Sequence, residues 1–179
     1  MRTIKYFFQF LIIIFLFLLF KILGLNTSSI IGGKLFQIIG PFFRSKELIH
    51  KNIIRAFPNM NQDKIKKISD GMWNNYGRIF AEYMFLKKFR MGQKGSNIIV
   101  EGQEVLDEIK NLDKPVVFIS GHFSNFELMA MQIEKSGIKL SAIYRPLNNK
   151  FLNIIMEIIR KEFICKHQIK KGIGGIKEL

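Results

Sequence analysis

The chain holds a single cysteine and four prolines, and no acidic residue comes before Glu47. With Cys165 alone, neither an intramolecular disulfide nor a cysteine-based metal site can form, and we expect a partly buried, chemically ordinary residue. A Gly-x-Ser-x-Gly elbow, a Walker loop and a His-Glu-x-x-His helix are also missing. The usual sequence signs of a serine hydrolase, a P-loop enzyme and a zinc peptidase are therefore absent.

The composition is that of a folded chain with a large basic excess. Of 179 residues, 48% are hydrophobic and 23% are charged, which is enough apolar material for one domain with a core. Lysine and arginine number 28 against 14 acidic residues, giving a formal charge of +14. This charge favours an anionic partner, either nucleic acid, anionic lipid or an acidic carrier protein. Because the first basic cluster flanks an apolar segment, we expect an anionic membrane and not nucleic acid.

That apolar segment lies at the N-terminus. Residues 6–20 read YFFQFLIIIFLFLLF, and a helix over 6–25 would be about 30 Å long, close to the hydrocarbon thickness of a bilayer. A cleaved signal peptide and a buried core helix are the alternatives. No small-x-small cleavage site follows, and apolar residues occupy every face of the helix. We therefore predict an uncleaved membrane anchor over residues 1–25, followed by a catalytic domain over 26–179.

Periodicity and turn residues predict an alternation of strands and helices in the second half of the chain. Helices are expected near 48–57 and from Asn61 or Asp63 to about Leu86, and the apolar stretch 26–43 is expected at the membrane surface. The alternation indicates an α/β domain with a partly parallel sheet. Its predicted strands are 97–102, 115–120 and 139–144, and its predicted helices are 103–112, 126–135 and 149–162.

The stretch ISGHFSNFELMA (119–130) carries the candidate chemistry. His122 would follow a buried strand, where open α/β sheets place their ligands, and its ordinary pKa of about 6.5 suits a general base. Glu127 can orient the imidazole, and Gly121 allows a sharp turn. The alternative is purely structural: Ser124 and Glu127 also fit a helix capping box. His50 and His167 have no acidic partner at useful spacing, so we expect both at the surface.

Longer blocks extend this motif over nearly the whole chain: NIIRAFPNM (52–60), MWNNYGRIFAEYMFL (72–86), VVFISGHFSNFELMA (116–130) and AIYRPLNNKFLNIIMEIIR (142–160). With the N-terminal anchor, they resemble the late acyltransferases of lipid A biosynthesis, the lauroyl/myristoyl transferase family of Gram-negative bacteria. The resemblance implies a glycerolipid-acyltransferase-like α/β domain with a mostly parallel central sheet flanked by helices. Family chains continue beyond the equivalent of Leu179, so we expect a C-terminally truncated member with an incomplete sheet.

The resemblance also implies an activity and its residues. A fatty acyl group would pass from acyl carrier protein to a hydroxyl of the Kdo-bearing lipid A precursor, without a metal or cofactor. His122 would be the general base and Glu127 its supporting acid, while Arg145, Gly121 and Asn125 would bind the substrates. The partners would be the acidic carrier, the glycolipid and an anionic membrane. The enzyme would sit in the bacterial inner membrane with its catalytic domain facing the cytoplasm.

Two other functions stay open at this point. An acyltransferase of related build could use another glycolipid or a phospholipid as acceptor. A catalytically inactive, truncated paralogue could keep only the ability to bind membrane lipid.

Overall fold

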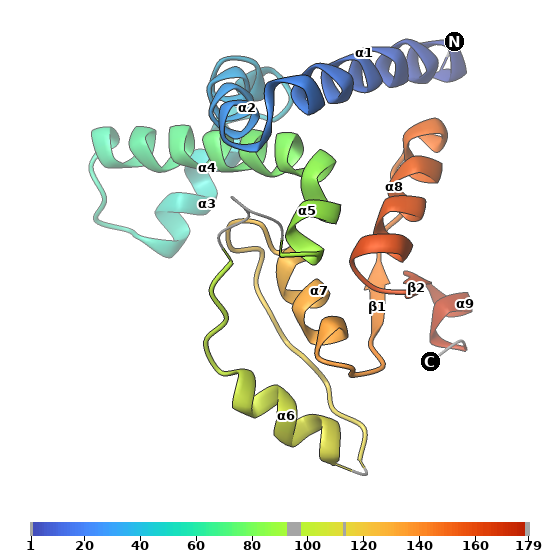
Figure 1. Ribbon diagram of the computed structural model, residues 1–179. Coiled ribbons are helices and arrows are strands. Elements are labelled where there is room, and N and C mark those ends of the chain that lie inside the picture. Colours follow the sequence, from blue (N-terminus) through green and yellow to red (C-terminus); the bar gives the residue numbers. More distant parts are fainter. Residues whose placement is uncertain (1, 93–97, 113, 178–179) are drawn as a thin grey trace. The chain divides into compact units, whose positions relative to one another are not determined.

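The computed structural model describes residues 2–92, 98–112 and 114–177. These residues are mostly helical and include a two-stranded parallel sheet (Figure 1). They form two compact units. One unit is Phe17–Met84, and the other combines Met1–Leu16 with Phe85–Leu179.

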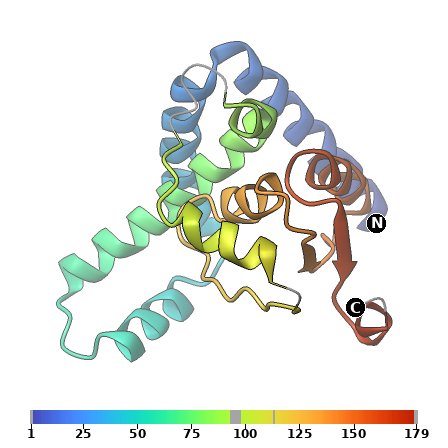
Figure 2. The ribbon, with the colours of Figure 1, turned by 60° about the horizontal axis from the view of Figure 1, so that its bottom comes forward.

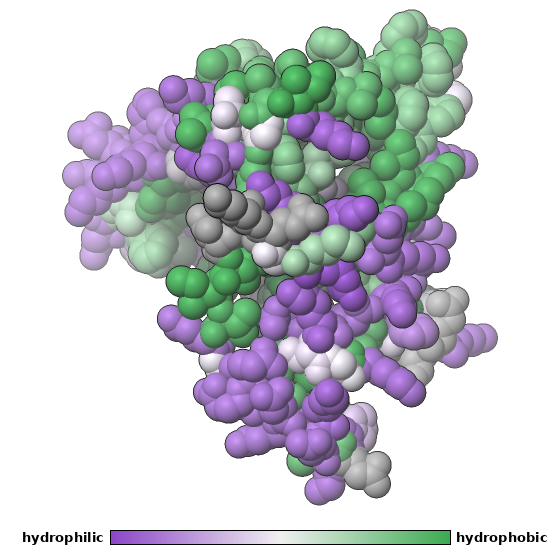
Figure 3. Space-filling model, in the orientation of Figure 1, coloured by the Kyte–Doolittle hydropathy of each residue, from purple (hydrophilic) through white to green (hydrophobic). Residues whose placement is uncertain are grey.

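Helix α1 (Arg2–Leu23) is the predicted apolar N-terminal helix, with bounds slightly earlier than expected. It is long and apolar enough to cross a membrane. Most of its large apolar side chains are exposed, and the surface over α1 is almost continuously hydrophobic in Figure 3. The helix ends where Gly24 adopts a φ of 79°, a left-handed conformation that costs glycine little.

The Phe17–Met84 unit is a helical assembly. It contains the end of α1, α2 (Leu25–Ile39), η1 (Gly40–Phe42), α3 (Lys46–Ala56) and α4 (Gln62–Glu82). Side chains cap two of the helices: the Ser45 hydroxyl accepts from the Leu48 amide, and Asn61 Oδ1 accepts from the Lys64 amide at 3.0 Å. Asn61 is therefore the cap of α4, as the first of the two predicted choices.

Helices α2 and α4 approach each other closely because glycines lie at their contact. A Cβ atom built on Gly77 would lie 2.0 Å from the Gly32 carbonyl oxygen, so a side chain there cannot be accommodated at this separation. Polar groups also join the two helices. Ser29 Oγ donates to Glu82 Oε1 at 2.8 Å and accepts from Arg78 Nη1 at 3.1 Å. The region 26–43, expected only as an apolar surface stretch, is thus largely the helix that packs on α4.

The second unit carries the sheet. Its elements after the 3-10 turn η2 (Tyr83–Phe85) are α5 (Leu86–Arg90), α6 (Gln103–Asn111), α7 (Glu127–Lys135), β1 (Ser141–Tyr144), α8 (Lys150–Phe163), β2 (His167–Lys170) and α9 (Ile173–Ile176). Strands β1 and β2 pair in parallel, with Ser141 opposite His167 and Tyr144 opposite Lys170. They lie side by side in Figure 2, with α8 as the helix that connects them.

Helix α5 is tied to α7 and to the end of α8. Arg90 forms an ion pair with Glu134 at 2.6 Å and donates to the Phe163 carbonyl oxygen. The start of α8 is fixed by Asn149, whose Oδ1 accepts from the Phe151 amide at 3.1 Å. These contacts hold α7 and α8, the two helices that supply the candidate site.

Two of the predicted strands are wrong and one strand was missed. Residues 98–102 are irregular, and position 97 lies outside the described residues. Residues 115–120 run as an extended segment towards α7 without joining the sheet, leaving Val117 83% and Ile119 93% exposed (Figure 1). β-branched residues favour extended backbone, but a strand also needs a neighbour for its amides and carbonyls. The expected parallel pairing is confirmed, between β1 and β2, and the described residues show no wider central sheet.

Candidate active site

The loop before α7 bends sharply at the predicted motif. Ser124 adopts a φ of 44°, unusual for a residue with a side chain, and the Phe126 amide donates to the Ser124 carbonyl oxygen at 3.1 Å. A Cβ atom on Gly121 would lie 2.5 Å from the folded-back ring of Phe123. Gly121 therefore permits this bend by its small size, in keeping with the turn expected there.

The capping box is not formed. Helix α7 begins at Glu127 with Phe126 at the N-cap, and no side chain provides the cap hydrogen bond. Asn125 lies in the same turn, where its carbonyl oxygen accepts from the Leu128 amide at 3.1 Å. Glu127 is the first residue of α7, and its side chain is buried in the unit.

Glu127 is buried, with 7% of its surface exposed, and it binds an arginine of α8. Its Oε1 atom accepts from Arg160 Nε at 3.0 Å and from Arg160 Nη2 at 2.5 Å. A buried carboxylate needs such compensation, because removing its charge from water is costly. The ion pair links the first turn of α7 to α8 across the candidate site.

The arginine is itself held by the sheet. The Arg160 guanidinium lies 5.8 Å from the centre of the Tyr144 ring, within the range of a cation–π contact. Tyr144, at the end of β1, donates its hydroxyl hydrogen to Glu157. Burial, reinforced by this hydrogen bond, raises the pKa of Tyr144 to about 12. Tyr144 therefore stays protonated at neutral pH and fixes the arginine without titrating.

Glu157 completes this network from α8. It accepts from Asn153 Nδ2 at 2.8 Å and lies 3.4 Å from Lys170 Nζ on β2. The hydrogen bond from Tyr144, followed by those from Asn153 and Lys170, lowers the pKa of the Glu157 carboxyl. At neutral pH the carboxylate is ionised, and it anchors α8 to the ends of both strands.

A cavity of about 470 Å³ brings most of the predicted residues together. Gly121, His122, Glu127 and Arg145 all line it. His122 is exposed and its ring meets the Phe126 ring edge-on, with centroids 4.3 Å apart. Arg145, also exposed, directly follows β1, so the cavity lies at the carboxyl end of a parallel strand, as expected for ligand sites.

A larger hollow of about 980 Å³ adjoins this cavity. The two share Met129, Ala130, Ala142 and Ile143 as lining residues, so one opens beside the other. Apolar side chains dominate the larger hollow, and the extended segment 115–118 forms one of its walls. A group bound near His122 therefore has an apolar space next to it.

Sequence reasoning missed two important residues of this site. Arg160 and Tyr144 both line the cavity, yet neither stands at a motif spacing from Glu127, which is 33 residues before Arg160. The sequence signal is that Arg160 shares one face of α8 with two other polar residues, Asn153 and Glu157, at helical spacing. Asn125, by contrast, was predicted to bind substrate and lies in the turn before α7, outside the cavity lining.

Comparisons with known proteins identify the family of the chain. Neither the curated proteins nor the solved structures gave a match. A family model described as bacterial lipid A biosynthesis acyltransferase matches residues 1–179. Because the match extends over the whole sequence, the chain belongs to the bacterial lipid A biosynthesis acyltransferase family.

Proposed function

We propose that this protein transfers a fatty acyl group from acyl carrier protein to a hydroxyl of the Kdo-bearing lipid A precursor. The observation that carries the proposal is the shared cavity: His122, Glu127 and two arginines line one hollow in a chain of this acyltransferase family. A base, a carboxylate and fixed cations are what acyl transfer from a thioester to an alcohol requires.

In the proposed reaction, His122 acts as the general base. Its imidazole takes the proton of the acceptor hydroxyl while the oxygen attacks the thioester carbonyl carbon. A tetrahedral intermediate forms, with negative charge on the former carbonyl oxygen. Its collapse breaks the carbon–sulfur bond, and the imidazolium returns the proton to the thiolate that leaves. An exposed histidine at the cavity wall suits this role, because acceptor and donor must both reach it.

Glu127 would stabilise the imidazolium from the first turn of α7. The same carboxylate is bound to Arg160 through Oε1. The guanidinium holds the carboxylate in place, and it also weakens the attraction of the carboxylate for the imidazolium. Arg145 at the cavity mouth would bind an anionic group of a substrate or the oxyanion of the intermediate.

The adjoining apolar hollow would hold the acyl chain during transfer. Its volume of about 980 Å³ and its shared wall with the His122 cavity support this assignment. Helix α1 would serve as the membrane anchor within residues 1–25, with the catalytic domain over 26–179 facing the cytoplasm from the inner membrane. The basic surface then has natural partners in the acidic carrier and in anionic lipid.

A transfer assay tests the proposed substrates. Membranes containing the full-length chain would be incubated with radiolabelled acyl carrier protein thioester and the Kdo-bearing precursor. We expect label in the glycolipid. Replacing the precursor by an analogue whose 3-hydroxyacyl chains lack the hydroxyl should abolish incorporation. Label in the analogue, or in membrane phospholipid only, would contradict the proposed acceptor.

A further inference from the structure

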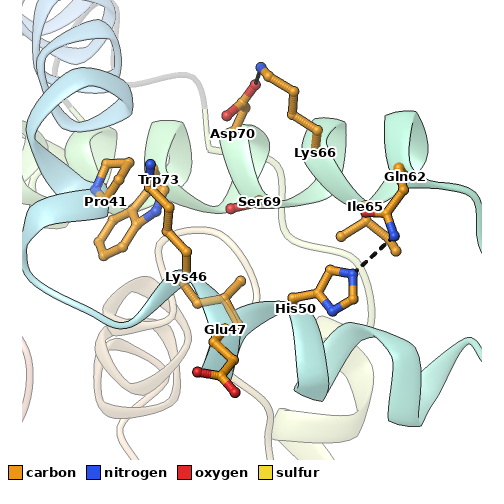
Figure 4. A pocket seen from close by; sticks show the side chains of 11 residues that line it. Pro41, Lys46, Glu47, His50, Gln62, Ile65, Lys66, Ser69, Asp70 and Trp73 are labelled. Carbon is orange, nitrogen blue, oxygen red and sulfur yellow. Dashed lines mark hydrogen bonds and ion pairs between the residues drawn. The ribbon is translucent and has the colours of Figure 1, made fainter.

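A cleft between α3 and α4 stands apart from the residues used above. It lies within the Phe17–Met84 unit and has a volume of about 480 Å³, enough for a small polar ligand. Buried Ile49, Ile65 and Trp73 form its apolar side (Figure 4). Lys46 and His50 of α3 bring polar groups to it.

Two lysines and two carboxylates line the cleft, and among the described residues only Lys66 and Asp70 of these four form an ion pair. Asp70 is bound to Lys66 at 2.6 Å, and the Glu47 carboxylate points away from Trp73 (Figure 4). Within the described part of the chain, Lys46 has no ion pair, and its side chain extends from α3 towards Trp73. Lys46 is therefore the cation of the lining that can turn to an anionic group, and Arg44 adds a second cation two residues earlier in the chain.

An aromatic pair next to the cleft indicates where that anion comes from. Phe42 is 87% and Phe43 is 73% exposed, and Arg44 follows them directly. Pro41 before this pair and Lys46 after it both line the cleft. Exposed aromatic rings followed by cations are typical of segments at the boundary between the hydrocarbon and the lipid headgroups. With both rings in the bilayer, Lys46 would stand at the depth of lipid phosphates.

The polar groups near His50 suit a phosphate. His50 Nε2 lies 3.3 Å from Gln62 Nε2, so an imidazole and an amide meet at the cleft. The cleft thus offers an ammonium, an imidazole and an indole within one hollow. An ammonium is a common phosphate binder, and charge-assisted hydrogen bonds are the strong ones.

We propose that the α3–α4 cleft binds the phosphate headgroup of an anionic membrane lipid, with Lys46 as the principal contact and Trp73 beside the ligand. This site concerns membrane binding and does not depend on the acyl transfer proposed above. A phosphodiester on a phospholipid and a free phosphate present the same oxygens. The exposed Phe42–Phe43 pair favours the lipid.

The sequence supplies its own reporter, because Trp73 is the only tryptophan. The full-length chain in neutral detergent would be titrated with short-chain dihexanoyl phosphatidylglycerol while tryptophan emission is recorded. We expect a saturable change, with the apparent Kd about tenfold higher in Lys46→Gln. Lys51→Gln is the matched control: it removes the same charge from an exposed position on α3 outside the cleft lining, and it should bind as the wild type does.

Two further ligands separate the sources of the signal. Dihexanoyl phosphatidylcholine, which has no net charge, and inorganic phosphate at the same concentrations should each bind at least tenfold more weakly. Unliganded emission spectra that match the wild type would show that the variants keep the Trp73 environment. Equal weakening in both lysine variants, equal binding of phosphatidylcholine, or inorganic phosphate binding as tightly as the lipid would each overturn the proposal.

Discussion

Alanine in place of Gly77 is expected to destabilise the Phe17–Met84 unit, although alanine is the better helix former. The added Cβ atom would lie 2.0 Å from the Gly32 carbonyl oxygen and 2.7 Å from the Phe36 Cβ atom. Both neighbours belong to α2, so α2 and α4 must move apart. Overpacking of this kind costs roughly 3 kcal/mol, and the gain in helix propensity returns about 1 kcal/mol. We expect a net loss of about 2 kcal/mol.

Gly71 on the same helix provides the matched control. A Cβ atom there meets nothing within 4 Å, and the residue is exposed. Gly71→Ala should therefore stabilise the unit by about 1 kcal/mol, through helix propensity alone. Trp73 emission during urea unfolding in detergent follows both variants, because this tryptophan lies between the two positions on α4. Equal unfolding midpoints for the two variants would refute the close approach of α2 and α4.

Three further predictions concern the unit that carries the candidate site. Arg160→Gln removes the guanidinium from buried Glu127 and should lower the free energy of unfolding by roughly 3 kcal/mol. Lys161→Gln changes an exposed neighbour and should alter that free energy little. Denaturant titration measures both, and the double variant Glu127→Gln/Arg160→Gln should regain much of the loss because it removes the buried charge as well. Cys165 is fully buried and burial raises the pKa of its thiol, so it should react with a thiol reagent only when the protein unfolds, and rapid native labelling would contradict this placement. In Tyr144→Phe, the tyrosinate absorbance titration should lose a component near pH 12. Because the pKa of Tyr144 is raised in the folded state, the contribution of this tyrosine to stability is complete below pH 10 and is lost as pH rises through about 12.

Local sequence signals predicted the helices well. The cap at Asn61, the helix start at Asn149 and the apolar spacing of α4 are properties of short segments, and the helices begin within a few residues of the expected positions. The strands were predicted less well, because pairing depends on distant residues. The segment 115–120 has a strand composition without a strand partner, whereas β2, which is mostly polar, is a strand because it pairs with β1.

The candidate site shows the same division between local and distant information. The motif from Gly121 to Glu127 contributes residues to the cavity lining, and so does Arg145, which follows β1. The arginine that binds Glu127 comes from α8, which follows β1 in the chain, whereas Glu127 precedes β1. No spacing rule connects the two residues. A capping box was an equally good interpretation of Ser124 and Glu127 by spacing, and the backbone at Ser124 excludes it.

The most direct test of the account is whether His122 is the base of acyl transfer. Initial rates of transfer from acyl carrier protein would be measured for the wild type, His122→Ala and His167→Ala, the last being an exposed histidine on β2. We expect His122→Ala to lower the rate by about a thousandfold and His167→Ala to leave it unchanged. A rate for His122→Ala within a few-fold of the wild type, in a protein that is folded and bound to the membrane, would contradict the account.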